Sequence, residues 1–169
     1  MGSAIRTGSV LARAGGAAAM FLLGAAVLVT PVRSADAPAV NTLAGSWGGS
    51  GRISYTDGSS ESIHCTANYT GGGNELRMAI QCKSDKNPIH VRSRLKIDGG
   101  RVSGDWEERT FNVAGTGSGT ASGNNLSLSL SGGGFSGSMA VSFSKSGHSV
   151  SITTQGIAMS RASMNFSRR

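Results

Sequence analysis

Residues 89–107 read IHVRSRLKIDGGRVSGDWE, and this stretch decides the fold. Apolar and polar residues alternate on both sides of Gly99-Gly100, which is typical of two half-buried β-strands joined by a tight turn. A two-residue turn at Gly99-Gly100 places the apolar residues of the two strands on one face and charged residues of opposite sign across from each other on the other face. The apolar face pairs Ile97 with Val102 and Leu95 with Gly104, and the charged face pairs Arg94 with Asp105 and Arg92 with Glu107. The stretch therefore predicts an antiparallel hairpin with one buried and one solvated face.

The same alternation continues from Gly45 to the end of the chain, interrupted by short Gly-, Asn- and Ser-rich connectors. Because such short connectors join antiparallel neighbours, the pattern predicts an all-β, antiparallel, up-and-down meander of about 8–10 strands, closed into a small barrel. The expected strands are 45–56, 61–70, 75–84, 88–98, 101–112, 114–122, 126–131, 135–145, 148–157 and 159–167.

Composition agrees with one small β-rich domain. The chain has 169 residues with 26 Gly and 2 Cys, and its 15% of charged residues is below the roughly 25% of an average protein. These values exclude a large multidomain enzyme, a helical bundle and a disulfide-dense scaffold.

The N-terminal residues have the layout of a secretory signal peptide. Arg6 and Arg13 precede the apolar run 17–29, which is shorter than the roughly 20 residues of a membrane-spanning helix. Small residues then allow cleavage after Ser34 or after Ala37, and Ser34 is the favoured site. We therefore expect a signal peptide over 1–34, a flexible segment over 35–43 and a β-barrel domain over 44–169, in a protein exported to the periplasm or secreted and not membrane-spanning after cleavage.

Cleavage would also change the charge of the chain. Residues 1–34 hold three of the 16 basic residues and none of the nine acidic ones, so the remaining chain carries a net charge of about +4. Its basic residues are scattered except at Arg92-Arg94-Lys96, which the hairpin register assigns to a solvated face. This pattern argues against a nucleic-acid partner.

The two cysteines lie on neighbouring predicted strands. A two-residue loop at Gly73-Asn74 makes Cys65 and Cys82 direct cross-strand neighbours, whereas a four-residue loop would place them diagonally. Directly opposed residues are close enough for a disulfide, and an exported protein is oxidised. We expect a disulfide rather than a metal site, because no His or third Cys lies nearby.

One face of the segment 111–121 carries Phe111 and Val113 and then three glycines, Gly115, Gly117 and Gly119. These glycines favour either a bend of the strand under a large neighbour such as Trp106 or an internal cavity. A turn or bulge is expected between Trp106 and Phe111, because the apolar positions change from even to odd numbers there.

Gly45-Ser46-Trp47 opens the first strand, and this Gly-x-Trp start resembles the calycins, the lipocalin and avidin-like group of barrels. The resemblance implies that Trp47 closes one end of the barrel beneath an arginine near the last strand, Arg161 or Arg168, with Arg161 assigned here. Residues 45–84 and 104–109 also resemble small exported alphaproteobacterial proteins. That second resemblance implies no activity, only a location in the Gram-negative cell envelope.

No catalytic, cofactor or metal constellation is found, so the chain is not expected to be an enzyme. His64, His90 and His148 are expected at the surface, and Glu107 and Glu108 point to opposite faces of one strand. Glu108 shares the face of Trp106, so it lies either at the barrel rim or, with Tyr69 and Trp106, in a ligand pocket.

Three functions follow from these expectations. The first is a non-enzymatic envelope barrel that binds a small apolar or amphipathic ligand. The second is an interaction module for an envelope protein, such as a protease inhibitor that acts through residues 35–43. The third is an outer-membrane barrel, which the scarcity of aromatic residues disfavours.

Overall fold

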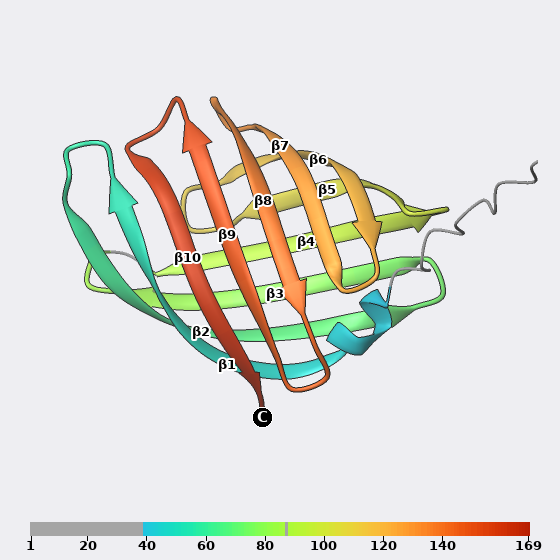
Figure 1. Ribbon diagram of the computed structural model, residues 1–169. Coiled ribbons are helices and arrows are strands. Elements are labelled where there is room, and N and C mark those ends of the chain that lie inside the picture. The colour runs from blue at the N-terminus through green and yellow to red at the C-terminus, as the bar shows by residue number, and fades with distance from the viewer. Residues whose placement is uncertain (1–38, 87) are drawn as a thin grey trace, which may run out of the picture. The chain divides into compact units, whose positions relative to one another are not determined.

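The computed structural model describes residues 39–86 and 88–169, so the expected signal peptide and residues 35–38 lie outside the described residues. These residues form a 3₁₀ turn and ten strands (Figure 1). The elements are η1 (Val40–Leu43), β1 (Gly45–Tyr55), β2 (Ser60–Gly72), β3 (Glu75–Ser84), β4 (Ile89–Asp98), β5 (Arg101–Glu108), β6 (Val113–Ser122), β7 (Asn125–Gly132), β8 (Phe135–Phe143), β9 (Gly147–Gln155) and β10 (Met159–Arg168). The expected strands agree with these bounds to within a few residues.

Every strand pairs antiparallel with its neighbours in the sequence, and β1 also pairs with β10 to close the barrel. The predicted all-β, up-and-down barrel is therefore confirmed, with ten strands. Closure leaves no strand edge open to solvent, which removes the usual route to edge-to-edge aggregation. Within the described residues, no helix is long and apolar enough to cross a membrane.

The register predicted for the hairpin of β4 and β5 is confirmed. Ile97 lies opposite Val102 and Arg94 opposite Asp105, as a two-residue turn requires. Gly99 and Gly100 have φ angles of 54° and 83°, and only glycine adopts two successive positive values without strain. This turn is thus set by its sequence alone.

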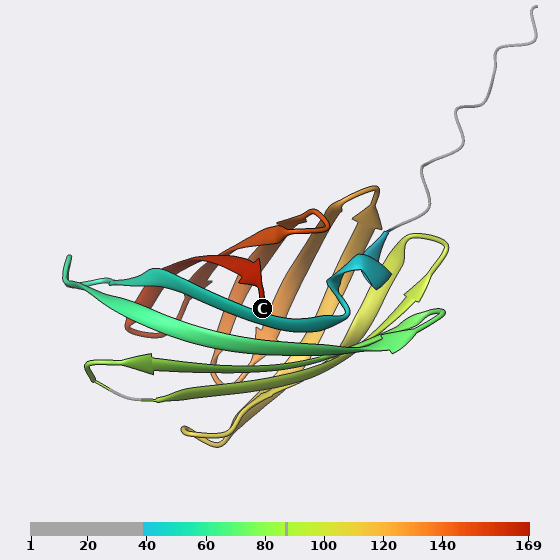
Figure 2. The same cartoon turned by 90° about the horizontal axis from the view of Figure 1, so that it is seen from below.

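Side chains alternate between an apolar interior and a polar exterior along each strand. The β2–β3, β4–β5, β6–β7 and β8–β9 turns lie at one end of the barrel, together with η1 and the C-terminus. We call this the plugged end; its inward side chains include Val40, Leu43, Trp47, Tyr69 and His148, all buried. The opposite end, with the other five turns, is called the far end. In Figure 2, η1 lies between β1 and the β6–β7 turn, and the Ala39 N–H donates to the Gly123 carbonyl.

The whole segment 35–43 was expected to be flexible, but the structure places residues 40–43 in η1. Val40 and Leu43 keep only 3% and 2% of their surface exposed, because η1 inserts both side chains into the plugged end. The apolar spacing of these two residues is that of a single helical turn. The expectation of a free segment is wrong for residues 40–43.

The inward glycines of β6 bend the strand rather than empty the interior. A Cβ atom at Gly115 would lie 2.0 Å from the Ser131 carbonyl oxygen and 2.6 Å from the Trp106 ring. A Cβ atom at Gly119 would lie 1.9 Å from the Ser127 carbonyl oxygen. The chain thus curves so tightly against β7 that no side chain fits, which is the role of a glycine at a barrel corner.

The expected break between Trp106 and Phe111 is confirmed as the four-residue turn between β5 and β6. Phe111 belongs to this turn and is 57% exposed, so its assignment to the inward face of a strand was wrong. Asn112 follows with a φ of 51°, a conformation that asparagine tolerates better than most residues. The turn therefore resets the alternation of inward and outward positions.

Candidate functional site

Trp47 is the centre of the plugged end. Its side chain is fully buried, and its Nε1 donates a hydrogen bond of 2.7 Å to the Leu43 carbonyl oxygen. The guanidinium of Arg168 stacks on the ring at 4.4 Å from the ring centre to Cζ. Indole and guanidinium attract each other through the ring quadrupole, so this contact stabilises the plug.

Arg168 also ties three chain segments together at this end. Its guanidinium donates to the carbonyl oxygens of Thr42 (2.7 Å), Ala44 (3.1 Å) and Lys145 (3.0 Å). The assignment of this position to Arg161 is wrong: Arg161 is exposed and lies opposite Ser54 on β1. The resemblance left two candidates, and Arg168 is the one that faces Trp47.

His148 is buried beside Trp47, which corrects the expectation of a surface histidine. Only 5% of its surface is exposed. Its ring meets the Trp47 ring edge-on at 4.7 Å and stacks on Phe166 at 4.5 Å. Burial lowers the pKa of His148 to about 4, so the imidazole is neutral at neutral pH.

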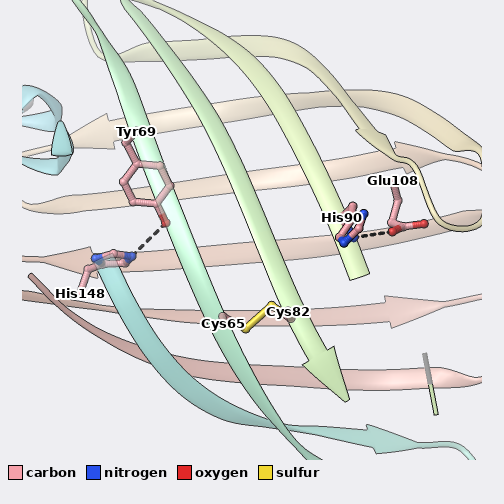
Figure 3. The surroundings of a disulfide bond; sticks show 6 residues. All are labelled: Cys65, Tyr69, Cys82, His90, Glu108 and His148. Atoms are coloured by element: carbon pink, nitrogen blue, oxygen red, sulfur yellow. Dashed lines mark hydrogen bonds between the residues drawn. A yellow bond between two sulfur atoms is a disulfide. The ribbon is translucent and has the colours of Figure 1, made fainter. Parts of the chain in front are cut away.

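Tyr69 completes this cluster. Its hydroxyl lies 3.0 Å from Nε2 of His148, and Figure 3 draws this hydrogen bond as a dashed line. Burial raises the pKa of the phenol above its ordinary value. Tyr69 is only 3% exposed. The predicted ligand-binding residue thus lies within the packed plugged end. Nδ1 of His148 has no hydrogen-bond partner among the described residues.

Trp106 has a different environment, in the half of the barrel toward the far end. It is half-buried, and its ring packs against Phe135 with 5.2 Å between ring centres. Its Nε1 donates to the Thr116 carbonyl oxygen at 3.1 Å. The ring covers Gly115, so the tryptophan takes the space that the glycine leaves.

Apolar side chains near Trp106 face inward yet keep exposed surface. In a closed barrel both edges of every strand are hydrogen-bonded to neighbours, so the sheet lies between these side chains and the outer surface. The half-buried inward positions in mid-strand with large apolar side chains are Met78, Ile80, Val91, Trp106, Leu130, Met139 and Ile152. We call this set the lumen residues.

Glu108 lies at the far-end terminus of β5 and caps the following turn. Its carboxylate accepts backbone hydrogen bonds from His90 (2.8 Å, drawn in Figure 3) and Phe111 (2.7 Å). Burial opposes ionisation, but these bonds outweigh it and hold the pKa of Glu108 below its ordinary value. The hydrogen bonds and ring contacts of the predicted residues Glu108, Tyr69 and Trp106 go to other residues and not to one another.

A second buried carboxylate, Glu61, was not singled out from the sequence. It is 7% exposed, and it accepts hydrogen bonds from the Tyr55 hydroxyl and, at 3.2 Å, from the Lys86 N–H. The Tyr55 bond lowers the pKa of Glu61, and burial with the nearby carboxylate raises the pKa of Tyr55 to about 12. Its odd position on the face of Ile63 and Cys65 was the signal for its inward direction.

The disulfide between Cys65 and Cys82 is confirmed, as is the register predicted for it. The two residues are direct partners on β2 and β3, with a Cα–Cα distance of 4.0 Å, and both side chains are buried in the interior (Figure 3). The loop of Gly73-Asn74 has the predicted two residues, since Gly72 pairs with Glu75.

Outside the interior, the described residues offer little that could act chemically. Among them, no group of three or more His, Cys, Asp or Glu side chains could hold a metal ion. Two shallow hollows lie along β8–β10 and β6–β8, and His148 is the one titratable residue that lines either of them. The interior is therefore the better candidate for a site.

Comparison with known proteins identifies the fold. No protein-family model matches the chain, and no curated protein matches its sequence. The structure is similar to the crystal structure of Rv2717c from M. tuberculosis, with a TM-score of 0.65 and 17% identity over 79% of this chain and 99% of that one. It is also similar to the S-type phycobiliprotein lyase CPES from Guillardia theta, with a TM-score of 0.58 and 10% identity over 76% of this chain and 89% of that one. These similarities confirm the predicted calycin-like barrel.

Proposed function

We propose that this protein is a non-enzymatic barrel of the Gram-negative envelope that binds a small apolar or amphipathic molecule in its interior. The observation that carries the proposal is the set of lumen residues. Apolar surface that water reaches inside a barrel costs about 25 cal/mol per Å², and a bound apolar molecule would recover this free energy. Calycin-like barrels are suited to such a role, since small barrels commonly enclose one ligand.

The distribution of polarity supports this function over that of an outer-membrane barrel. Outward positions are mostly Ser, Thr, Lys, Arg, Asp and Glu, whereas inward positions are mostly apolar. A lipid-facing barrel needs an apolar outer belt with aromatic girdles. The polarity found here favours apolar molecules within the barrel.

The environment of the titratable groups supports a binding role rather than catalysis. The buried ionisable side chains of the described strands are Glu61, Tyr69, Glu108 and His148. Both carboxylates accept hydrogen bonds from their own surroundings, and the imidazole packs between two aromatic rings.

The alternative, a protease inhibitor acting through residues 35–43, has less support. Such a function needs a segment that can leave the barrel and enter a protease. Val40 and Leu43 are instead buried in the plugged end, and the Trp47 indole donates to the Leu43 carbonyl. We therefore favour the ligand-binding function.

Native mass spectrometry of the protein purified from a bacterial periplasm tests the proposal. We expect extra mass in the native spectrum that disappears on denaturation. The denatured mass also locates the cleavage site, and a deficit of two hydrogens reports the Cys65–Cys82 bond. A native spectrum of the apo-protein alone, at every expression level tried, would contradict the proposal.

Two adjacent residues of β8 provide a matched control. Met139 faces inward and Ala140 outward, so Met139→Trp should fill the lumen and Ala140→Trp should leave it unchanged. We expect the bound fraction to fall at least several-fold in the first variant only. Near-ultraviolet circular dichroism would verify that both variants keep their fold.

A further inference from the structure

The charged groups that face the interior already have hydrogen-bond partners. On the inward faces of the described strands the ionisable side chains that are charged at neutral pH are Glu61, Glu108 and Arg168. Glu61 and Glu108 each accept hydrogen bonds from groups at the far end. Arg168 is committed to three backbone carbonyls and the Trp47 ring at the plugged end. No lysine points inward on these strands.

On these strands no inward-facing cationic side chain lies beside the lumen residues to pair with an anionic ligand, and the nearest carboxylates, Glu61 and Glu108, already accept hydrogen bonds. A carboxylate or an ammonium taken from water into an apolar interior without a partner costs several kcal/mol. An anionic head group would also be repelled by Glu61 and Glu108 at the far end. An uncharged molecule meets neither penalty.

One neutral polar group does lie among the lumen residues. Ser93 faces inward on β4, directly between Met78 on β3 and Trp106 on β5. The residue keeps some exposed surface, but its Oγ is shielded from solvent and has no hydrogen-bond partner among the described residues. An unpaired hydroxyl in such a place costs about 1–3 kcal/mol, which a ligand hydroxyl or carbonyl would offset after a rotation about χ1.

We propose that the ligand is an uncharged, lipid-like molecule whose single hydroxyl or carbonyl group hydrogen-bonds to Ser93 Oγ beside Trp106, while its apolar body contacts the other lumen residues. This inference rests on the proposed ligand-binding function and specifies the class of ligand. The site should therefore bind a fatty alcohol more tightly than a fatty acid or a fatty amine of the same chain length.

A panel of three probes with one chain length tests the assignment. The mature protein is first titrated with the neutral fluorophore N-phenyl-1-naphthylamine, and the bound fluorophore is then displaced by 1-decanol, decanoate or decylamine. We expect 1-decanol to displace it at concentrations at least tenfold lower than either charged probe. Equal displacement by decanoate or decylamine would overturn the inference but leave ligand binding in place.

Ser93→Ala tests the polar contact, with Ser103→Ala on the outward face of β5 as the matched control. Loss of one hydrogen bond should weaken 1-decanol binding about fivefold to tenfold and leave binding of the fluorophore unchanged. Unchanged 1-decanol binding in Ser93→Ala would overturn the role of Ser93. Failure of the unmodified protein to bind the fluorophore or any of the three probes, together with an apo mass in the native spectrum, would instead refute the proposed function itself.

Discussion

Trp47 and Trp106 both point into the barrel, yet their surroundings differ in almost every respect. Trp47 has no exposed surface, its indole N–H is bonded to η1, and Arg168 covers its ring. Trp106 is half-buried, and one aromatic neighbour, Phe135, packs against it. Trp47 connects η1 with β10, which lie far apart in the sequence, whereas Trp106 lies in the hairpin of β4 and β5.

This difference separates the barrel into a part that holds it together and a part that remains available. At the plugged end, the inward side chains fill the space between strands and satisfy most of each other's polar groups. The lumen residues, by contrast, keep part of their apolar surface exposed, although Ile53 and Ile63 near the far end of β1 and β2 are buried. A barrel whose packed core holds the strands together can keep its fold while a less tightly packed part of its interior admits a ligand.

Replacing each tryptophan by alanine should test this difference most directly and give the largest effect. Trp47→Ala removes a fully buried side chain and its contacts with Arg168 and His148, so we expect a loss of about 3–5 kcal/mol in the free energy of unfolding. Trp106→Ala should cost less than half as much, because its ring is already partly exposed. Urea denaturation followed by far-ultraviolet circular dichroism measures both; equal losses would mean that the two ends are packed alike.

The disulfide should produce the next largest effect. Apart from Leu76, Cys82 is the one buried residue of β3, so the covalent bond anchors the far half of this strand. For a sequence separation of 17 residues, we expect Cys65→Ala with Cys82→Ala to destabilise the protein by about 3 kcal/mol. Hydrogen exchange should increase first in β3 toward the far end, while the amides around Trp47 stay protected. A uniform increase over the whole barrel would contradict this local role.

His148 should make stability depend on pH through the plugged end. Its pKa is lowered from 6.5 to about 4 by burial, so between these values the unfolded chain binds a proton that the folded protein does not. Stability should therefore fall as the pH decreases from 7 to about 4, by on the order of 2 kcal/mol. The lowered pKa values of Glu61 and Glu108 place their own contribution at lower pH.

His148→Gln provides the control for this pH effect, because glutamine can keep a hydrogen bond to Tyr69 but does not titrate. Unfolding midpoints in urea at several pH values should decline for the unmodified protein and remain nearly constant for the variant over the same range. The same decline in both proteins would assign the effect to other groups.

Much of the fold could be predicted because local sequence determines it. Each hairpin turn is short enough to set the register of its own two strands, which is why the Cys65–Cys82 pair and the Arg94–Asp105 pair were expected correctly. The alternation of apolar and polar residues then identifies the inward face. These interactions need no knowledge of distant parts of the chain.

The site was harder to predict because it depends on how the barrel closes. No turn joins β1 to β10, so nothing local sets their register, and it is this register that places Arg168 rather than Arg161 opposite Trp47. His148 could have been recognised as inward, since it shares the parity of Val150 and Ile152 on β9. Its contacts with Trp47 and Tyr69, however, follow from tertiary packing across the barrel end.

The two arginines of β10 give the smallest effects and the sharpest test of the closing register. Arg168→Ala removes three hydrogen bonds to carbonyl oxygens and the stacking on Trp47 at a partly solvated site, so we expect a loss of about 1–2 kcal/mol. Arg161→Ala, at an exposed position of the same strand, should stay within about 0.5 kcal/mol of the unmodified protein. Thermal or urea unfolding of the two variants side by side measures the difference. If Arg161→Ala were the more damaging, the register of β1 and β10 would be shifted, and the plug would be built around a different arginine.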